Sequence, residues 1–273
     1  MYVPERHIPL ISRFGQDLEI QAINYLAVSD ALLGNVEDAL SLGAQAIAHA
    51  RELNHANTLA YALWHIGVWL PSIVRDTQAT HRYGTELLEF AQTNGLDFWE
   101  KFSLPHIAIN GYGKARVEAA EDAEKELKIW RDQYNGEMLV PEILCRIAEA
   151  YLDEGLTSHA SRVLTEATSL MERKDQVYWE SELYRLRGRL ASMVSKDDPQ
   201  VAIEEFRRAM SIARERSTKL LELRVATDFA RLMAERDEPA DAKQMLSSVY
   251  DWFTGGFELP DLVDAKAMLN TLR

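Results

Sequence analysis

Small residues recur at fixed intervals along this chain, and they constrain its fold more than any other feature. The stretch from Val140 onward reads "VPEILCRIAEAYLDEGLTSHASRVLTEATSLM". Counted from Pro141, its small residues at positions 8, 20 and 27 are Ala148, Ala160 and Ala167, and large apolar residues occupy positions 4, 7, 11 and 24. Helix axes approach to roughly 8–10 Å only where side chains are small. The stretch therefore predicts two closely packed helices and a third that packs on them.

The same alternation returns along the whole chain, which is typical of an internal repeat. The small residue near the start of each second helix is an alanine: Ala39, Ala79, Ala123, Ala160, Ala202 and Ala242. Consecutive members of this series are 37 to 44 residues apart. The pattern predicts six helix pairs, at about 17–54, 57–95, 99–135, 140–174, 177–217 and 218–254.

Apolar residues recur at three- and four-residue spacing, as in amphipathic helices, and no alternating strand pattern stands out. Turn signals such as "LLGN", "QTNG", "DEG" and "RDEP" separate the expected helices. We expect an all-α fold: an α–α superhelix, or solenoid, of about six helix pairs with a short N-terminal helix. The prediction treats residues 1–273 as a single domain.

The stretch "YDWFTGGFELPDL", from Tyr250, reads as the end of the last repeat. We expect Trp252 and Phe253 to pack inward at the end of a helix, and the two glycines that follow to break it. Phe257 is expected to anchor the turn. A final helix within 257–273 would then cover the exposed face of the last repeat, as solenoid ends require.

The spacing of small and large residues resembles the tetratricopeptide repeat (TPR) family. Several segments narrow the resemblance: "YVPERHIPLISRFGQD", "ALLGNVEDAL", "ESELYRLRGRL", "LLELRVATDFARL" and "VYDWFTGGFELPDLVDAKAML". With them the chain resembles the C-terminal repeat region of large bacterial multidomain signalling regulators. There an AAA- or STAND-type ATPase lies upstream, often with an adenylate/guanylate cyclase or a winged-helix output domain. The resemblance implies a regulatory module that acts with such a domain in cis.

Composition limits the partners and the compartment. The net charge of −13 argues against generic binding to nucleic acid or to an anionic membrane. Leu53–Val74 has no charged residue, but its Asn, His and Pro residues fit a buried helix better than a membrane span. A single cysteine excludes an internal disulfide, and the charged start does not resemble a signal peptide. We expect a cytoplasmic protein.

No catalytic motif is complete. "NGYGKA", at Asn110–Ala115, lacks the first glycine and the Ser/Thr of a phosphate loop, and Gly111 is expected at a small helix-packing position. No two of the seven histidines have the i,i+4 spacing of metal ligands on one helix. Cys145 is expected to be a half-exposed groove residue. The sequence predicts no catalytic residue, no cofactor and no metal, and an enzyme is the least favoured class.

In such an array, positions 2, 5, 6 and 9 of each first helix face outward from the concave side, where they can contact a partner without carrying the packing. Aromatic and arginine residues often supply binding energy at interfaces. The predicted groove comprises Asn24, Tyr61, Trp64, His65, Tyr112, Arg146, Glu149, Tyr184, Arg185 and Asp228. We expect it to bind an acidic or amphipathic protein or peptide segment. Two alternatives stay open: Trp64 and Tyr184 pack between repeats, or the domain senses a small molecule for an ATPase-linked transcriptional regulator.

Overall fold

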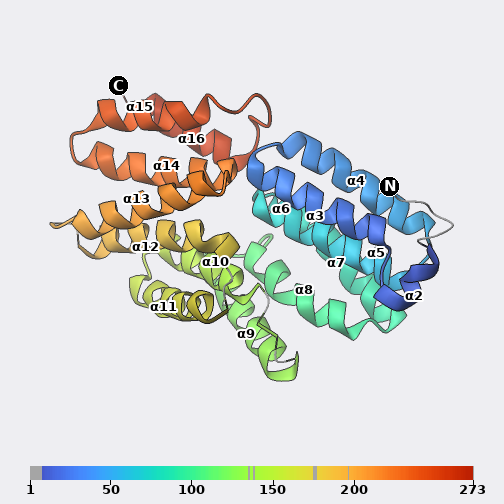
Figure 1. Cartoon of the computed structure of the whole chain (residues 1–273). Coiled ribbons are helices and arrows are strands. Elements are labelled where there is room, and N and C mark those ends of the chain that lie inside the picture. Colours follow the sequence, from blue (N-terminus) through green and yellow to red (C-terminus); the bar gives the residue numbers. More distant parts are fainter. Residues whose placement is uncertain (1–7, 135, 138, 175–176, 196, 273) are drawn as a thin grey trace. The chain divides into compact units, whose positions relative to one another are not determined.

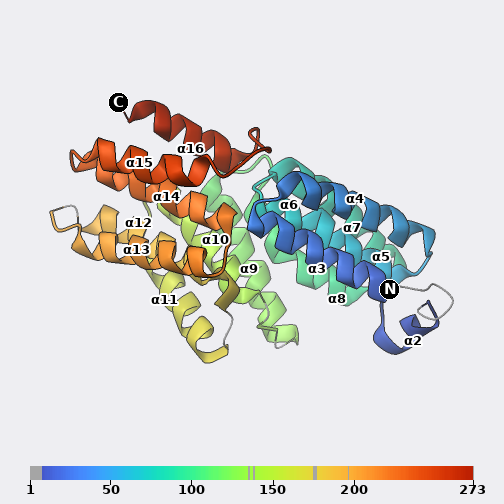
Figure 2. The ribbon, with the colours of Figure 1, turned by 45° about the horizontal axis from the view of Figure 1, so that its top comes forward.

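The computed structural model describes residues 8–134, 136–137, 139–174, 177–195 and 197–272 (Figures 1 and 2). The described residues contain helices and no strand, and the helices pack in consecutive antiparallel pairs. The predicted all-α helical-repeat fold is confirmed. Packing divides the chain into two compact units, residues 1–112 and 113–273.

After two short N-terminal helices, the first unit holds two helix pairs and one further helix. Its elements are η1 (Ile8–Leu10), α2 (Ile11–Phe14), α3 (Leu18–Leu33), α4 (Val36–Glu52), α5 (Ala56–Ala62), η2 (Leu63–Trp69), α6 (Leu70–Ile73), α7 (Thr77–Asn94) and α8 (Asp97–Asn110). α3 packs on α4, η2 packs on α7, and α8 packs on α7 and η2. Asp17 caps α3 by accepting hydrogen bonds from the Glu19 and Ile20 N–H groups, which are left without partners inside the helix.

α5, η2 and α6 form one continuous rod whose middle, η2, is a π-helix. The Leu70 N–H donates to the His65 carbonyl, five residues back. Pro71 follows at once; it lacks an N–H, and its ring clashes with the carbonyl four residues earlier in an ordinary α-helix. A wider turn before a proline relieves this conflict. Every residue from Ala60 to Val74 is buried, as expected for a helix packed between its neighbours.

The second unit holds three helix pairs between two further helices. Its elements are α9 (Arg116–Tyr134), α10 (Val140–Asp153), α11 (Thr157–Lys174), η3 (Val177–Trp179), α12 (Glu180–Val194), α13 (Gln200–Glu215), α14 (Lys219–Glu235), α15 (Pro239–Tyr250) and α16 (Pro260–Thr271). The pairs are α10–α11, α12–α13 and α14–α15, and each first helix also packs on the first helix of the next pair. Ala148, Ala160 and Ala167 are fully buried, as their role in close packing requires.

The expected third pair, 99–135, corresponds to α8 and α9, which belong to different units. Gly111 does not lie at a helix-packing position, so this expectation is wrong: it ends α8 with a φ of 52°. Glycine adopts this left-handed conformation without the clash that a Cβ brings. In this region the glycine at a helix contact is Gly84 of α7, where a Cβ would lie 2.8 Å from Ile107.

The C-terminal helix α16 packs on α14 and α15 through Leu262 and Ala265, both fully buried, which agrees with the predicted cap. The preceding turn differs from the prediction. Phe253 is buried, but Trp252 is 42% exposed and Phe257 is 48% exposed, so Trp252 does not pack inward and Phe257 does not fix the turn by burial.

Candidate functional site

Five of the ten predicted groove residues lie in the first unit. Asn24 is on α3, Tyr61 on α5, and Trp64 and His65 on η2, whereas Tyr112 follows α8. The first four are 0 to 6% exposed, and only Tyr112 reaches solvent, with 51% exposure. The expectation that these side chains would not carry packing is wrong for the first four, because they fill the interior between helices.

Trp64 is the centre of an aromatic cluster built on η2 and α8. Its ring centroid lies 4.6 Å from Phe102, 5.6 Å from His106 and 5.4 Å from Trp69. Rings at these separations stabilise a core beyond the area they bury. The sequence left open whether Trp64 contacts a partner in the groove or packs between repeats. The structure shows that Trp64 packs between helices.

His65 is held in the same cluster by its main chain and by Tyr61. Its Nδ1 lies 2.9 Å from the Tyr61 carbonyl oxygen, and the two rings are 4.0 Å apart. Burial lowers the pKa of His65 to about 4, although the bond to the Tyr61 carbonyl acts in the opposite direction. The imidazole is consequently neutral at physiological pH and carries no charge for recognition.

Asn24 and Trp64 bring unsatisfied polar atoms into this unit. Both amide atoms of Asn24 and the Trp64 Nε1 are buried without a hydrogen-bond partner among the described residues. A buried polar group without a partner costs about 1–3 kcal/mol of stability. In the described part of the chain, no hydrogen bond to these side-chain atoms offsets that cost.

The other five predicted residues lie in the second unit, where three of them meet in a charged cluster. Arg185 of α12 is 2% exposed and contacts three carboxylates. Its Nε and Nη2 donate to both Glu182 oxygens at 2.9 Å, Nη2 also donates to Glu149 at 2.6 Å, and Nη1 donates to Asp228 at 2.5 Å. The guanidinium thereby joins α10, α12 and α14.

This cluster continues toward solvent through partly exposed charges. Arg189 of α12 donates to Asp153 of α10 at 2.8 Å, and Arg116 of α9 contacts the same carboxylate at 2.9 Å. Arg231 pairs with Asp228 at 2.5 Å. We call the set formed by Arg116, Glu149, Asp153, Glu182, Arg185, Arg189, Asp228 and Arg231 the charge ladder. Its inner members are buried, and its outer members are accessible.

The arginines of the charge ladder favour the ionised form of Asp228. Burial alone would raise the pKa of the Asp228 carboxyl, but Arg185, Arg189 and Arg231 together hold it below its ordinary value.

Cys145, on α10, is 1% exposed, so the expected half-exposed groove position is wrong for it. Burial first, and then the charge of Glu182, raise the pKa of its thiol. Cys145 is therefore protonated and enclosed, which is unlike a nucleophile.

Arg146 and Tyr184 lie away from the centre of the charge ladder. Arg146 bonds to Glu142, one turn earlier on α10, at 2.9 Å. The ring of Tyr184, 8% exposed, is covered by Arg208 of α13 at 4.0 Å from its centroid, and Arg187 lies at 5.4 Å. Tyr184 thus packs within its own helix pair and does not face a groove, which corrects the prediction for this residue.

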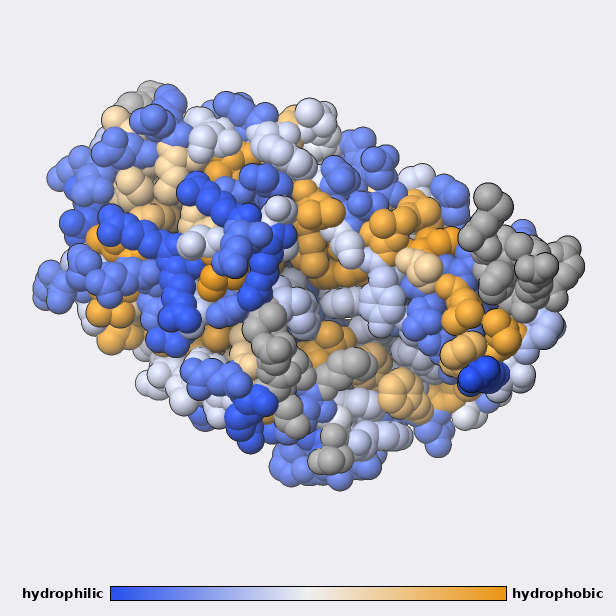
Figure 3. All heavy atoms as spheres, viewed as in Figure 1, coloured by the Kyte–Doolittle hydropathy of each residue, from blue (hydrophilic) through white to orange (hydrophobic). Residues whose placement is uncertain are grey.

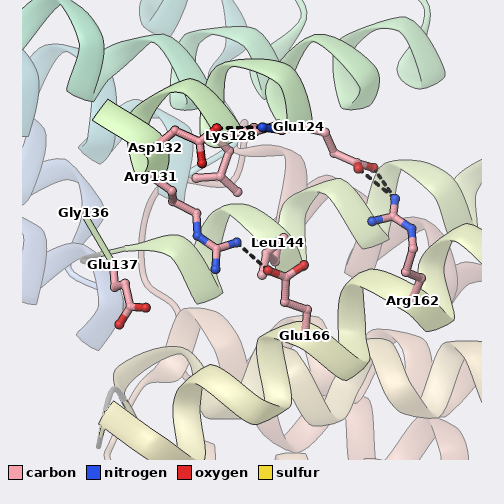
Figure 4. A pocket seen from close by; sticks show the side chains of 10 residues that line it. Glu124, Lys128, Arg131, Asp132, Gly136, Glu137, Leu144, Arg162 and Glu166 are labelled. Carbon is pink, nitrogen blue, oxygen red and sulfur yellow. Dashed lines mark hydrogen bonds and ion pairs between the residues drawn. The ribbon is translucent and has the colours of Figure 1, made fainter. Parts of the chain in front are cut away.

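A pocket of about 410 Å³ opens between α9, α10 and α11 (Figure 4). Leu144 lies at its base, and two ion pairs cross it from α9 to α11. Arg131 bonds to Glu166 at 2.5 Å, and Arg162 bonds to both oxygens of Glu124 at 2.7 and 2.8 Å. The sequence did not predict this site, because the predicted groove positions of the repeat lie on first helices. The sequence nevertheless contains a signal for this site, because α9 and α11 carry opposite charges about one repeat apart: Arg131 and Glu166 are separated by 35 residues, and Glu124 and Arg162 by 38.

The described residues hold no group of three or more His, Cys, Asp or Glu side chains arranged to bind a metal ion. Across the described part of the chain, none of the helices combines the length and the apolar character that crossing a bilayer demands. No protein-family model matches the sequence. A search of curated proteins finds no match either.

Proposed function

We propose that this chain is a non-catalytic protein-interaction module that binds an acidic polypeptide segment at exposed arginines of α9, α12 and α14 in its second unit. The observation that supports the proposal is the outer end of the charge ladder. There Arg116, Arg189 and Arg231 are 43%, 22% and 47% exposed, whereas Asp153 is the one carboxylate of the ladder with comparable exposure, at 35%. Glu149 and Asp228 are 15% and 9% exposed.

The inner part of the charge ladder prepares the outer part for binding. Because Arg185 holds Glu149 and Asp228, these carboxylates in turn orient Arg189 and Arg231. Side chains that are already ordered lose less entropy when a partner arrives. Arginine also offers two parallel donors to a carboxylate, which suits recognition of Asp and Glu side chains.

The test is charge reversal at the exposed arginines. The double variant Arg189→Glu and Arg231→Glu should lose the partner that co-purifies with the parent chain, and its affinity for the partner, once identified by mass spectrometry, should fall more than about tenfold by calorimetry. Arg207→Glu, on the exposed face of α13, is the matched control and should bind normally. A double variant that keeps every partner of the parent chain contradicts the proposal.

A small-molecule sensor is the second candidate, and the pocket between α9 and α11 favours it. Its volume of about 410 Å³ lies within the usual range for ligand sites. A thermal-shift screen of charged metabolites should then find a compound that raises the unfolding temperature saturably. Arg131→Ala should remove this effect. If no metabolite stabilises the parent chain, the interaction module remains the better proposal.

We also propose that the module acts in the cytoplasm within a bacterial signalling system, next to an ATPase or cyclase domain in the same polypeptide. The resemblance of the five quoted segments to regulator repeat regions supports this context, and the single cysteine agrees with a reducing compartment. An ATPase encoded immediately upstream in the same reading frame is the expected finding. An unrelated or oppositely oriented gene at that place would contradict it.

A further inference from the structure

The first helix of the array, α3, lacks a neighbour that the other first helices have. Along the chain each first helix packs on the second helix of the preceding pair: η2 and its flanking helices follow α4, α8 follows α7, and α10, α12, α14 and α16 follow α9, α11, α13 and α15. No helix among the described residues precedes α3 in this way. The outer face of α3 and α4 is therefore uncovered in the described part of the chain.

Two contacts show how such neighbours fit together. Ile66 of η2 lies against Gly43 of α4, where an added Cβ would be only 2.5 Å from the Ile66 Cγ2. Ile107 of α8 lies in the same way against Gly84 of α7, where an added Cβ would be 2.8 Å from the Ile107 Cγ1. A branched side chain of the first helix thus occupies the space left by a small residue on the preceding second helix.

Leu26 occupies the corresponding position of α3. Like Ile66, Ile147 and Phe229, it stands directly before the small residue of its first helix. Those three side chains are 5%, 0% and 9% exposed, but Leu26 is 52% exposed. Leu26 therefore has the position of a packing residue without the helix that would cover it.

The surface around Leu26 is apolar over a wide area. Leu33 on α3 is 38% exposed, and Leu40 on α4 is 41% exposed. Tyr25, next to Leu26, is 50% exposed, and one side of its ring contacts His65 of η2, with 5.4 Å between the ring centroids. The neighbouring exposed residues Ala22, Ser29, Ser41, Ala44, Gln45 and Ala48 are small or uncharged, whereas Glu37 and Asp38, at the start of α4, are exposed and acidic. Figure 3 shows hydrophobic side chains gathered over α3 and α4. Exposed apolar patches of this kind commonly mark interaction sites.

The charge around this patch selects between possible occupants. No Lys or Arg occurs between Gly15 and Ala50, whereas five acidic residues do. Asp30 lies between Leu26 and Leu33 on one face of α3, and Glu37 precedes Leu40 by one turn. A second copy of this face would bring acidic groups against acidic groups. A helix with basic flanks would instead be attracted.

We propose that the outer face of α3 and α4 binds an amphipathic helix of a partner protein. Its apolar stripe carries a small residue, Gly or Ala, opposite Leu26. Its flanks carry Lys or Arg near Asp30 and Glu37. This surface is separate from the charge ladder of the second unit, and the two make opposite demands on the charge of a partner.

Two synthetic peptides test this proposal with the full chain. Each has about 18 residues, or five helical turns, with a Leu-rich stripe around a central Ala. One carries Lys along both flanks, and the other carries Glu at the same places. By fluorescence anisotropy the Lys peptide should bind saturably and more weakly as salt rises. The Glu peptide should bind at least about tenfold more weakly.

Leu26→Asp should weaken binding of the Lys peptide by about tenfold or more. Val263→Asp, which changes a 49% exposed side chain on α16, is the matched control and should bind like the parent. Both changes are at exposed positions, so circular dichroism should show unfolding midpoints close to that of the parent. The proposal fails if the Lys peptide does not bind, if both peptides bind equally, or if Leu26→Asp binds normally. A parent dimer by light scattering that Leu26→Asp converts to a monomer would assign the face to a second copy and overturn the proposal.

Discussion

At the scale of single residues, the interior of this protein contains charged and titratable groups that a helical-repeat core does not need for packing. Arg185, with 2% exposure among three carboxylates, is the most enclosed of the arginines in the charge ladder. Removing one partner of a buried ion pair leaves a charge without compensation, which is far more costly than replacing all partners by apolar groups.

Replacing this arginine should therefore destabilise the second unit strongly. Arg185→Met leaves Glu182, Glu149 and Asp228 close together without a counter-charge, and we expect a loss of about 3–5 kcal/mol in the free energy of unfolding. Urea denaturation followed by circular dichroism measures it. Adding Glu182→Gln and Asp228→Asn to the variant should restore part of the loss. No recovery in the triple variant would mean that packing, not charge, explains the effect.

His65 predicts a pH dependence of stability. Its pKa is about 4 in the folded protein, against about 6.5 in an unfolded chain, so the unfolded state binds the proton first as the pH falls. Stability from His65 is complete above about pH 6.5 and is lost between pH 6.5 and 4, by about 3 kcal/mol in total. Urea denaturation across this range should show a smaller loss for His65→Gln than for the parent. If the free energy of unfolding fell equally with pH in the two proteins, the prediction would be contradicted.

At the scale of elements, the helix pairs depend on a few positions where two helices almost touch. Gly43 of α4 is the clearest, because a side chain there would overlap Ile66 of η2. Ile66 is held by the π-helical turn before Pro71, so it has little freedom to move aside. Cores tolerate lost bulk and added bulk poorly when the backbone cannot shift.

Gly43→Val should lower the free energy of unfolding by about 1–3 kcal/mol. Ala44→Val, one residue further on the exposed side of α4, introduces the same side chain without the overlap and is the matched control. Helix propensity alone would favour Gly43→Val over Ala44→Val, because valine is a better helix former than glycine and a poorer one than alanine. Thermal unfolding of both variants measures the difference. Ile66→Ala in the Gly43→Val background should recover part of the stability. Equal midpoints for the two valine variants would show that the contact is not limiting.

At the scale of the whole molecule, the chain consists of two compact units that meet in sequence at Tyr112 and Gly113. Exposed Lys114 lies in the short connection after α8 and pairs with Asp122 of α9. Exposed connections between compact units are the usual sites of first proteolytic cleavage. Each unit has its own buried core, as the fully buried Leu63 and Ile147 illustrate.

Limited trypsin digestion should therefore cut first after Lys114. The two fragments should keep their helical circular dichroism after separation, because each contains complete helix pairs. Mass spectrometry identifies the cut, and Lys114→Gln should delay it. First cleavage inside α10 or α14, or loss of helicity in both fragments, would contradict the prediction.

The sequence predicted the helices well because small residues and turn signals report local backbone requirements. Ala148, Ala160 and Ala167 have the burial that the repeat pattern implies. The sequence did not predict the π-helix before Pro71, since a proline inside a helix can be accommodated in several ways. It also misplaced Gly111, because a glycine at a helix end and one at a helix contact look alike in a single sequence.

The candidate site was harder to predict, because repeat position gives the direction of a side chain but not its exposure. Trp64, Tyr184 and Arg185 have groove positions by count, yet all three are buried by neighbouring side chains. Large aromatic and arginine side chains reach across to adjacent helices, where they pack or form ion pairs. The long reach that makes these residues good binding groups also allows them to be used inside the fold.

Several ion pairs in and beside the charge ladder share a common interval, although Arg185 and Asp228 are 43 residues apart. Glu149 to Arg185, Asp153 to Arg189 and Glu180 to Arg216 are each 36 residues apart, and Arg116 to Asp153 and Arg224 to Asp261 are each 37 apart. Losing or gaining a few residues between such partners would rotate one of them around its helix and separate acid from base. Evolution can therefore lengthen or shorten this half of the chain most easily in steps of a whole helix pair.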